Sequence, residues 1–499
     1  MFWDLRGGKG KRQRQARPSW GFAPRLAGHR AAAIVKRMNL PAFAERRRRL
    51  AGLLSEAGGG VAIVPTAPEQ RRNSDCDFPF RHDSYFHYLT GFDEPDSWLV
   101  LDSAGRSTLF CRSSDPEREI WDGLRLGPQA APAQLGVDAA FPLQALDARL
   151  PELLADQPAV WTPFGLHASL APRLEAWLQT VRLRTDREGV HAPALQRDLC
   201  LPLDEMRLIK DATEIDTMRR AAQISAAAHA RAMRFAAHRL HRDPGAGVPE
   251  YEIEAELLHE FRRHGAQAPA YPSIVAAGAN ACVLHYAAGN ARLQPGELCL
   301  VDAGCELDGY ASDVTRTWPA SGRFSAPQRE LYEIVHAAQL AAIEVTRPGA
   351  RKLDGHWAAV RVLAQGMLDS GLLSRSACGD VDAVIESAAY NRYYMHSTGH
   401  WLGRDVHDVG EERSLAEAPV EEHHRLGGKV LRRPSRRLEV GMALTIEPGL
   451  YVRPAPDVPE RYWNIGIRIE DDAVITPGGC ELLSRGVPVA ANEIEALMR

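Results

Sequence analysis

Three histidines lie within twelve positions of one another in the segment YYMHSTGHWLGRDVHD (393–408): His396, His400 and His407. Imidazole is a common metal ligand, so this spacing raises the question of a metal site. The HxxxH spacing of the first two matches a helical zinc-binding pattern, but that pattern requires a glutamate directly after the first histidine, where this chain has Ser397. Two glycines also interrupt the segment, and each costs about 1 kcal/mol in a helix. The segment is therefore not expected to be a zinc helix, and further ligands must come from elsewhere.

Carboxylates occur at an apolar hairpin in the second half of the chain. The sequence LCLVDAGCELDGYASDVTRTW contains two strand-like runs around Asp308 and Gly309, which is a strong hairpin signal. A two-residue turn there places Asp302 opposite Thr315, with Asp313 on the same face as Asp302. Such diagonal neighbours lie within roughly 7–8 Å of each other. Both carboxylates can therefore contact a shared pair of metal ions.

Two more acids follow the same pattern near the end of the chain. Glu447 closes the apolar run of MALTIEPGLYV, and Glu470 lies in the alternating run NIGIRIEDDAVIT. Each acid taken alone has an ordinary explanation as a surface residue or a partner in a surface ion pair. Four acids in hydrophobic strands are harder to explain in that way. An unpaired carboxylate in such a strand would be costly to bury and would normally protonate, so this number of acids needs another explanation.

Two divalent cations would balance the four negative charges. Four carboxylates with one neutral imidazole suit hard or borderline ions such as manganese or cobalt. Two such ions about 3.5–4 Å apart share a bridging water, lower its pKa and polarise a carbonyl. The chemistry expected from these residues is hydrolysis of an amide or ester.

From about residue 40 to the end, the chain resembles the metallopeptidase family of aminopeptidase P (Xaa-Pro aminopeptidase), prolidase and methionine aminopeptidase. The motifs that carry the resemblance are DSYFHYLTGFDEP, LHY, VDAGCELDGYASDVTRT, MHSTGHWLGRDVHD, TIEPGLY and IRIEDD. The similarity is greatest to bacterial or mitochondrial-type aminopeptidase P. It implies an α/β creatinase-like N-terminal domain followed by an α+β catalytic domain with the pita-bread fold.

The resemblance also implies a metal-ligand set, matched motif by motif: Asp302, Asp313, His400, Glu447 and Glu470. In the family, the residues matching Asp313 and Glu470 bridge two ions. Asp302 then completes one metal site, and His400 with Glu447 completes the other. The cofactor implied is a pair of divalent ions, with Mn²⁺ preferred and Co²⁺ or Zn²⁺ as alternatives.

The remaining site residues are implied in the same way. Glu447 would accept a proton from the bridging water, which attacks the scissile carbonyl. His285 and His407 would bind the substrate and the tetrahedral intermediate as preformed oxyanion donors. His396 and Tyr451 would complete this environment. Arg468 would hold Asp302 from behind, the kind of outer support that metal ligands need.

A chain of 499 residues is too long for one ordinary core, so more than one domain is expected. We expect a basic extension over 1–38, an N-terminal domain over 39–205 and a catalytic domain over 206–499. Within the last, the charged and turn-rich residues 411–440 are expected to form an inserted, solvated surface loop that affects access for long peptides.

Local patterns give the elements of these domains. In the first domain, short apolar runs (GVAIVP, WLVLDS, STLFC) alternate with helix-like stretches such as LDARLPELLADQ, which is typical of an α/β domain. Asp211 followed by Glu214 is a helix-start signal. Further helices are expected over 250–264 and 328–346, packed on a mostly antiparallel sheet.

Composition limits the classes of partner that we expect. Hydrophobic residues make up 45% and charged residues 25%, as in globular proteins, and the net charge of −4 gives no reason to expect nucleic acid or an anionic membrane as partner. No apolar run approaches the ~18 residues of a spanning helix. The expected partners are peptides with proline at the second position. The resemblance also implies that the chain assembles into a homodimer or homotetramer.

The cysteines bear on localisation. The eight cysteines form no CxxC pair, which indicates a reducing compartment such as the cytoplasm. Residues 1–38 contain ten Lys/Arg and one acid, so an organellar location is the alternative if they form a targeting segment.

The predicted function is removal of an N-terminal residue that precedes proline. Prolidase, which takes only Xaa-Pro dipeptides, is the alternative enzyme. A non-catalytic binding module with the same fold is less favoured because all five ligands are present and residues 40–499 show no basic stripe.

Overall fold

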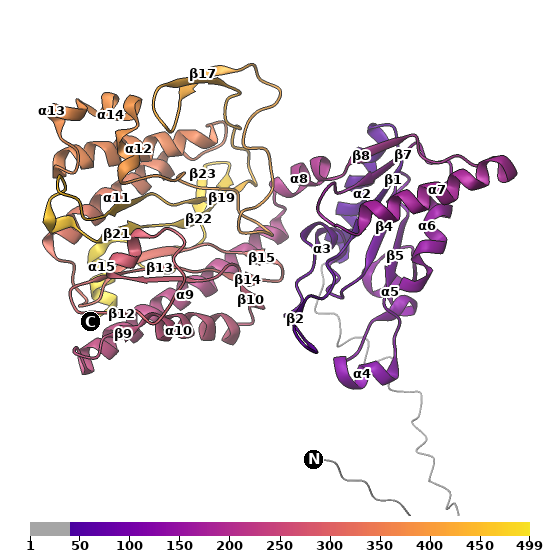
Figure 1. Ribbon diagram of the computed structural model, residues 1–499, viewed down its shortest axis with the longest axis horizontal. Helices are drawn as coiled ribbons and strands as arrows, with labels where there is room; N and C mark the ends of the chain where they lie inside the picture. Colours follow the sequence, from indigo (N-terminus) through magenta and orange to yellow (C-terminus); the bar gives the residue numbers. More distant parts are fainter. Residues whose placement is uncertain (1–39) are drawn as a thin grey trace, which may run out of the picture.

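The computed structural model of the protein describes residues 40–499, and the basic extension expected over 1–38 lies outside them. Figure 1 shows two domains side by side, joined by helix α8 (Cys200–Leu208). The sheets and hydrophobic cores of the two parts are formed separately, the N-terminal part around two clusters and the C-terminal part around a larger one. The two-domain organisation expected from the chain length is thus present.

The N-terminal domain is an α/β domain, as expected. Its helices are α2 (Leu40–Glu56), α3 (Ser84–Thr90), α4 (Pro116–Asp122), α5 (Gly127–Leu135), α6 (Leu146–Leu154) and α7 (Leu170–Glu188). Its strands are β1 (Val61–Pro65), β2 (Arg71–Asn73), β3 (Cys76–Asp77), β4 (Trp98–Asp102), β5 (Ser107–Cys111), β6 (Ala139–Pro142), β7 (Ala159–Thr162) and β8 (Leu195–Asp198). The three apolar runs named above form β1, β4 and β5.

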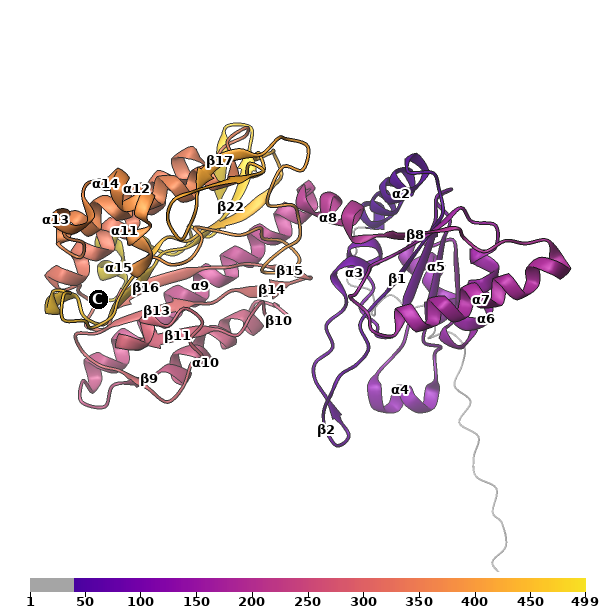
Figure 2. The ribbon, with the colours of Figure 1, turned by 45° about the horizontal axis from the view of Figure 1, so that its top comes forward.

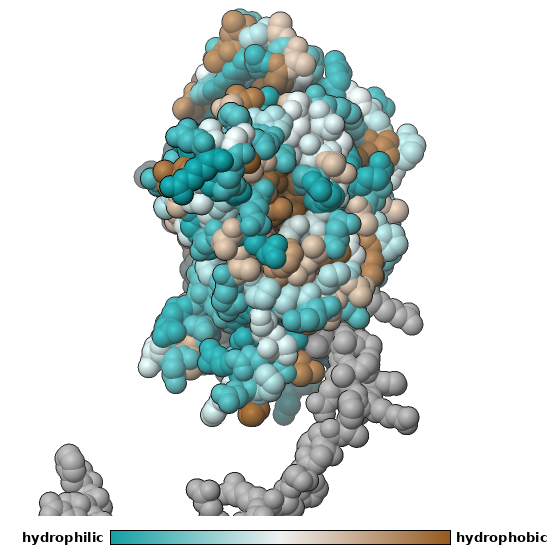
Figure 3. All heavy atoms as spheres, turned by 90° about the vertical axis from the view of Figure 1, so that its right-hand side faces the viewer, coloured by the Kyte–Doolittle hydropathy of each residue, from teal (hydrophilic) through white to brown (hydrophobic). Residues whose placement is uncertain are grey.

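A mixed six-stranded sheet in the order β6-β5-β4-β1-β7-β8 organises this domain. Strands β1, β4 and β5 pair antiparallel, whereas β5–β6, β1–β7 and β7–β8 are parallel. The outer face of the domain is mostly hydrophilic, with hydrophobic side chains in separate spots (Figure 3). The β2–β3 hairpin projects from the body of the domain (Figure 2).

The C-terminal domain is built from long helices and short antiparallel strands. Its helices are α9 (Ala212–Arg242), α10 (Glu250–Arg263), α11 (Ala326–Val345), α12 (Lys352–Ser370), α13 (Arg375–Cys378), α14 (Val381–Ser387) and α15 (Ala491–Leu497). Its strands are β9 (Val248–Pro249), β10 (Ala268–Pro269), β11 (Ile274–Ala277), β12 (Arg292–Leu293), β13 (Leu298–Asp302), β14 (Cys305–Leu307), β15 (Tyr310–Ala311), β16 (Thr315–Pro319), β17 (Val420–His423), β18 (Lys429–Arg432), β19 (Ala443–Ile446), β20 (Gly449–Val452), β21 (Ile465–Arg468), β22 (Asp471–Thr476) and β23 (Gly479–Leu482). The expected helices at 250–264 and 328–346 correspond to α10 and α11.

Helix α9 begins where the sequence predicted. The Asp211 side chain accepts hydrogen bonds from the backbone of Thr213 and Glu214, and the Glu214 side chain accepts from the Asp211 backbone N–H, which completes a capping box. The helix then runs for 31 residues. In Figure 1 the strands lie between the pair α9–α10 and the pair α11–α12. Side chains from both helix pairs and from the strands share one hydrophobic core.

Strand pairing positions the polar residues of interest. The hairpin β14–β15 turns at Asp308 and Gly309, with Leu307 opposite Tyr310. The register continues into β13–β16, where Asp302 pairs with Thr315 as predicted. Instead of one sheet, several small antiparallel sheets of two or three strands form this domain.

The segment 411–440 differs from the expected loop. It contains the hairpin β17–β18, with Val420 opposite Arg432 and His423 opposite Lys429. The loop was expected because half of the strand residues are charged and the apolar ones do not alternate, although Gly427 and Gly428 do mark the turn. The hairpin is largely exposed, in agreement with the expected surface position.

Among residues 40–499, no helix is long and apolar enough to cross a membrane.

Candidate metal centre

The four acids meet at strand ends inside the C-terminal domain. Asp302 is the last residue of β13, whereas Asp313 precedes β16, Glu447 follows β19, and Glu470 lies between β21 and β22. They were expected within strands, and only Asp302 is. Where a strand ends, the backbone leaves the ladder and side chains from different sheets can turn toward one point. The isolated bridge between Thr315 and Glu470 joins two of these ends.

His400 is the histidine of the 393–408 segment that lies among the acids. Its Nε2 is 3.4 Å from Oδ2 of Asp313 and 3.8 Å from Oε1 of Glu447. One ligand atom each from Asp313, His400 and Glu470 lies within 4.8 Å of the other two. The segment itself contains no helix, in agreement with the rejection of the zinc-helix motif.

The surroundings of His400 orient its ring toward the acids. Its Nδ1 lies 2.9 Å from the carbonyl oxygen of Trp401, so Nδ1–H donates and the lone pair of Nε2 faces the carboxylates. The backbone N–H of Thr445 donates to the carbonyl oxygen of His400, and the backbone N–H of His400 donates to the hydroxyl of Thr445, which fixes the segment to β19. Gly399 is required for this close approach, because a Cβ there would lie 2.0 Å from the Thr445 carbonyl oxygen.

Tyr271 is a member of the site that sequence reasoning missed. Its hydroxyl lies 2.6 Å from Oδ1 of Asp302 and also within hydrogen-bond distance of Oδ1 of Asp313. The pairing of β11 with β13, which sets Ile274 opposite Asp302, brings the preceding tyrosine to the two carboxylates. No local pattern in QAPAYPSIV marks this residue, so only the strand pairing could have identified it.

Arg468 lies behind Asp302, as the resemblance implied. Its Nη2 donates to Oδ2 of Asp302 at 2.6 Å, and its Nη1 donates to the hydroxyl of Tyr451 at 3.0 Å. The Tyr451 hydroxyl is in turn 2.9 Å from Nε2 of His396. The second missed residue is Thr315, whose hydroxyl donates to Glu470 at 2.7 Å and accepts from Nε of Arg468 at 3.2 Å.

Burial and mutual repulsion disfavour the ionised forms of these carboxylates. Burial, followed by repulsion from Glu470, raises the pKa of Glu447 to about 8. Burial and neighbouring carboxylates raise the pKa of Asp313 and Glu470 well above the usual range. Added positive charge would remove this penalty. Four carboxylates and one oriented imidazole nitrogen therefore fit a pair of divalent cations.

The other histidines lie around this cluster. The ring centroids of His407 and His400 are 4.3 Å apart, and burial together with the adjacent His400 lowers the pKa of His407. Nδ1 of His396 is 3.7 Å from Oε2 of Glu447. His285 is exposed in the loop that follows the 3-10 helix η3 (Gly278–Cys282). Burial first, and then charged neighbours that include His285, lower the pKa of both His396 and His407.

Hard oxygen donors, one imidazole and neutral histidines beside a buried cluster define the class of metal-dependent hydrolases. Comparison with known proteins agrees. Residues 216–477 match the model of metallopeptidase family M24, and residues 43–161 match that of the aminopeptidase P N-terminal domain. The chain belongs to metallopeptidase family M24, in its aminopeptidase P branch. Its fold is accordingly the pita-bread catalytic domain behind an aminopeptidase P N-terminal domain.

Individual relatives cover nearly the whole chain. The chain is 41% identical to the Xaa-Pro aminopeptidase of Haemophilus influenzae over 459 residues, which is 91% of this chain and 96% of that protein. The structure of Pseudomonas aeruginosa aminopeptidase PepP is 44% identical, with a TM-score of 0.84, and covers 93% of this chain and 99% of that one. A Zn-substituted Escherichia coli aminopeptidase P in complex with product is 40% identical, with a TM-score of 0.83 and the same coverage.

Proposed function

We propose that the protein is a metal-dependent aminopeptidase that hydrolyses the N-terminal Xaa-Pro bond of peptides. The convergence of Asp313, His400 and Glu470 is the observation that carries the metal dependence. The substrate class rests on family membership and on the 41% identity to relatives named Xaa-Pro aminopeptidase.

We propose Asp302, Asp313, His400, Glu447 and Glu470 as the ligands of two divalent ions. When bound, such ions lower the pKa of water and polarise a carbonyl. Manganese is our proposal for the native metal because the donor set is rich in hard oxygen ligands. The carboxylate of Glu447, which belongs to this donor set, would accept the proton that the attacking water gives up.

The histidines have roles in binding the substrate under this proposal. A lowered pKa keeps His407 neutral near pH 7, so that its ring donates one hydrogen bond to the substrate without carrying a charge. His285, exposed on the loop above, would contact the substrate from the other side. His396 and Tyr451 would hold the orientation of Arg468, which in turn holds Asp302.

We also propose the domain limits 39–205 and 206–499, with 411–440 as a surface insertion and 1–38 as an extension. The family matches end at 161 and begin at 216, so the proposed boundary, within α8, lies between them. A cytoplasmic location is supported by the eight cysteines, all of which are free. A homodimer or homotetramer is proposed from the resemblance alone.

The test is a chelation and add-back assay with Xaa-Pro-Yaa tripeptides. Chelated protein should lose activity and regain it with Mn²⁺, and Asp313→Asn protein should bind less metal and stay inactive. Hydrolysis of Xaa-Pro dipeptides alone would identify a prolidase instead. Metal-loaded protein that binds these peptides without cleaving them would be a binding module. Activity that persists after rigorous demetallation would overturn the mechanism.

A further inference from the structure

The segment between His400 and His407 is held by side chains of the N-terminal domain. Nη2 of Arg81 donates to the carbonyl oxygen of Arg404 at 2.9 Å and to Oδ1 of Asp405 at 3.1 Å. The hydroxyl of Ser84, at the start of α3, donates to the same Asp405 oxygen at 2.6 Å. The backbone that leads to His407 therefore rests on the neighbouring domain as well as on its own.

Arg207, near the end of helix α8, and Lys210, just after the helix, bind the same segment at the junction between the two domains. Arg207 donates to Asp405 at 2.7 Å and to Asp408 at 2.6 Å, and Lys210 donates to Asp408 at 3.0 Å. Arg207, Lys210 and Asp408 are almost fully buried. Both acids of the GRDVHD motif are thus used in positioning the segment, which leaves Arg404 to be explained.

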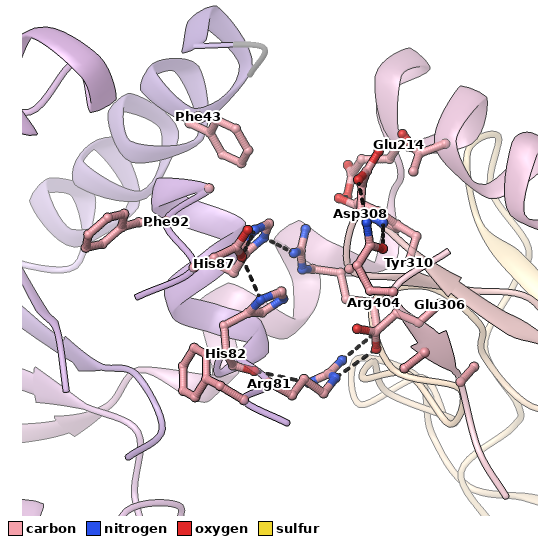
Figure 4. Close-up of a pocket in the computed structure, with 18 of the residues that line it drawn as sticks. Phe43, Arg81, His82, His87, Phe92, Glu214, Glu306, Asp308, Tyr310 and Arg404 are labelled. Atoms are coloured by element: carbon pink, nitrogen blue, oxygen red, sulfur yellow. Dashed lines mark hydrogen bonds and ion pairs between the residues drawn. The ribbon is translucent and has the colours of Figure 1, made fainter. Parts of the chain in front are cut away.

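The side chain of Arg404 crosses to the N-terminal domain (Figure 4). Its Nη2 contacts Nδ1 of His87, on α3, and its guanidinium lies 4.7 Å from the ring centroid of Tyr310. A guanidinium has only donors, so Nδ1 of His87 must carry a lone pair. The proton of this imidazole is then on Nε2, which lies 2.9 Å from Oδ1 of Asp93.

His82 completes the arrangement. Its Nδ1 also lies 2.9 Å from Oδ1 of Asp93, and its ring stacks on that of His87 with centroids 3.7 Å apart and planes inclined by 15°. Asp93 therefore accepts from two imidazoles and fixes the tautomer of both. The charged groups that face His87 are Asp93, Arg404 and, beyond the stacked His82, Arg81.

His82, His87 and Asp93 have the composition of a metal site, but the geometry favours a hydrogen-bonded contact. One nitrogen or oxygen of each lies within 4.8 Å of the others. However, one nitrogen of each ring already lies 2.9 Å from the same acceptor, Oδ1 of Asp93, so both are engaged in hydrogen bonds. A metal on Nε2 of His87 would also put the proton on Nδ1, where it would oppose Arg404.

The contact lies at a cavity between the domains. The cavity has a volume of about 640 Å³, and its lining includes Phe43, Phe92, His87 and Arg404. Its charged residues Arg81 and Glu306 form an ion pair across the two domains at 2.8 Å. The open space gives the Arg404 side chain room to leave His87, so the contact can break without unfolding either core.

We propose that Arg404 and His87 are positioning residues, whose contact fixes the 403–408 segment and through it the ring of His407. The N-terminal domain then takes part in the reaction of its neighbour by limiting the motion of a substrate-binding histidine. This inference rests on the proposed function, because the role of His407 does.

The contact also has a predictable pH dependence. Burial, and then the adjacent Arg404 and His82, lower the pKa of His87 to about 3. Once Arg404 leaves and the ring faces the cavity, the charge of Arg404 no longer opposes protonation, and the pKa of His87 rises toward its ordinary value of about 6.5. Protonation therefore favours the open state, so the contact is fully stable above about pH 6.5 and weakens as pH falls toward 3.

The test compares Arg404→Met with His87→Gln and with the control Arg220→Met. Methionine keeps the length of the side chain without its donors, whereas glutamine keeps one acceptor for Arg404 and one donor for Asp93 but does not titrate. Arg220 lines the same cavity and is not among the residues that hold 403–408. Metal content and thermal melting would establish that each variant is folded and loaded.

Arg404→Met should lower kcat/KM on an Xaa-Pro-Yaa tripeptide about tenfold, the effect of losing an outer positioning contact, and should speed hydrogen exchange of 403–408. His87→Gln should match wild type near pH 7.5 and lose less activity than wild type on acidification to about pH 5.5. The proposal is overturned if Arg404→Met retains wild-type kcat/KM and exchange, or if Arg220→Met changes both equally. If wild type cleaves no such peptide, the proposed function fails, and the exchange rates alone decide whether the contact holds the segment.

Discussion

Nη2 of Arg468 donates a 2.6 Å hydrogen bond to Oδ2 of Asp302, and both side chains are almost completely buried. The other nitrogens of the guanidinium are also engaged, Nη1 with Tyr451 and Nε with Thr315. One planar group thus fixes a carboxylate, a phenol and a hydroxyl at known angles. A lysine ammonium has no such fixed fork, so the orientation of Asp302 depends on arginine specifically.

Arg468→Lys should therefore weaken metal binding and lower activity by about 10–100-fold, the usual effect of losing a partner behind a metal ligand. Charge is preserved, so a merely electrostatic role would predict little change. The measurement is metal affinity by titration of chelated protein, together with kcat on a tripeptide. Arg432→Lys, on the exposed β18, is the control. Wild-type affinity in Arg468→Lys would contradict this role.

Tyr271 should matter most in the metal-free protein. Its hydroxyl lies within hydrogen-bond distance of both Asp302 and Asp313, two carboxylates that otherwise repel each other, and can donate to either. Tyr271→Phe should destabilise chelated protein by about 1–3 kcal/mol, since a hydrogen bond to a charged group is lost. Bound cations would supply the missing compensation, so the metal-loaded variant should lose less. Thermal melting with chelator and with Mn²⁺ measures the stability loss in each state. Equal losses in the two states would contradict the prediction.

Metal-free protein should become less stable as pH rises. The pKa of Glu447 is raised to about 8, and those of Asp313 and Glu470 are also raised, so the folded apoprotein holds more protons than the unfolded chain. Stability is therefore greatest below the ordinary carboxyl pKa values, 3.8 for aspartate and 4.5 for glutamate, and is lost as pH rises through about 8.

Bound metal should reverse this trend, because cations favour the ionised carboxylates. The rise in melting temperature on adding Mn²⁺ should be larger near pH 8 than near pH 6, and binding should release protons. Calorimetric titrations in buffers of different ionisation enthalpy would count those protons. A metal-induced shift that is the same at both pH values would show that the carboxylates are already ionised without metal.

Sequence alone predicted the parts of the site that depend on local register. The Asp-Gly turn at 308–309 determined that Asp302 pairs with Thr315, because every residue of a hairpin is fixed once its turn is known. The capping box of α9 was predictable for the same reason, since it involves only Asp211 and Glu214.

What sequence did not predict depends on pairings between distant segments. Tyr271 reaches the carboxylates only because β11 pairs with β13. The contact of Arg404 with His87 joins two domains across 317 positions of the chain, and neither residue has a local pattern that distinguishes it. The β17–β18 hairpin was missed because its strands are largely exposed and mix charged with apolar residues without alternation, so no hydrophobic period separates them from a loop.

Glu250 should position the loop that carries His285. Its carboxylate is fully buried and accepts four hydrogen bonds from one segment: from the backbone N–H of Ala277 and of Gly289, from the side-chain amide of Asn280 and from the hydroxyl of Tyr286. A carboxylate can accept at both oxygens, whereas a glutamine amide can accept at only one. Glu250→Gln therefore leaves donors facing an NH₂ group.

The expected result for Glu250→Gln is a stability loss of about 1–3 kcal/mol and a severalfold increase in KM, with full metal content. KM should change more than kcat because the loop carries a proposed substrate contact and no proposed ligand. Glu252→Gln, two residues later on α10 and partly exposed, is the matched control. Hydrogen exchange over 278–289 should rise in the first variant only. If KM stays at the wild-type value while exchange rises, the loop moves without consequence, and His285 does not bind the substrate.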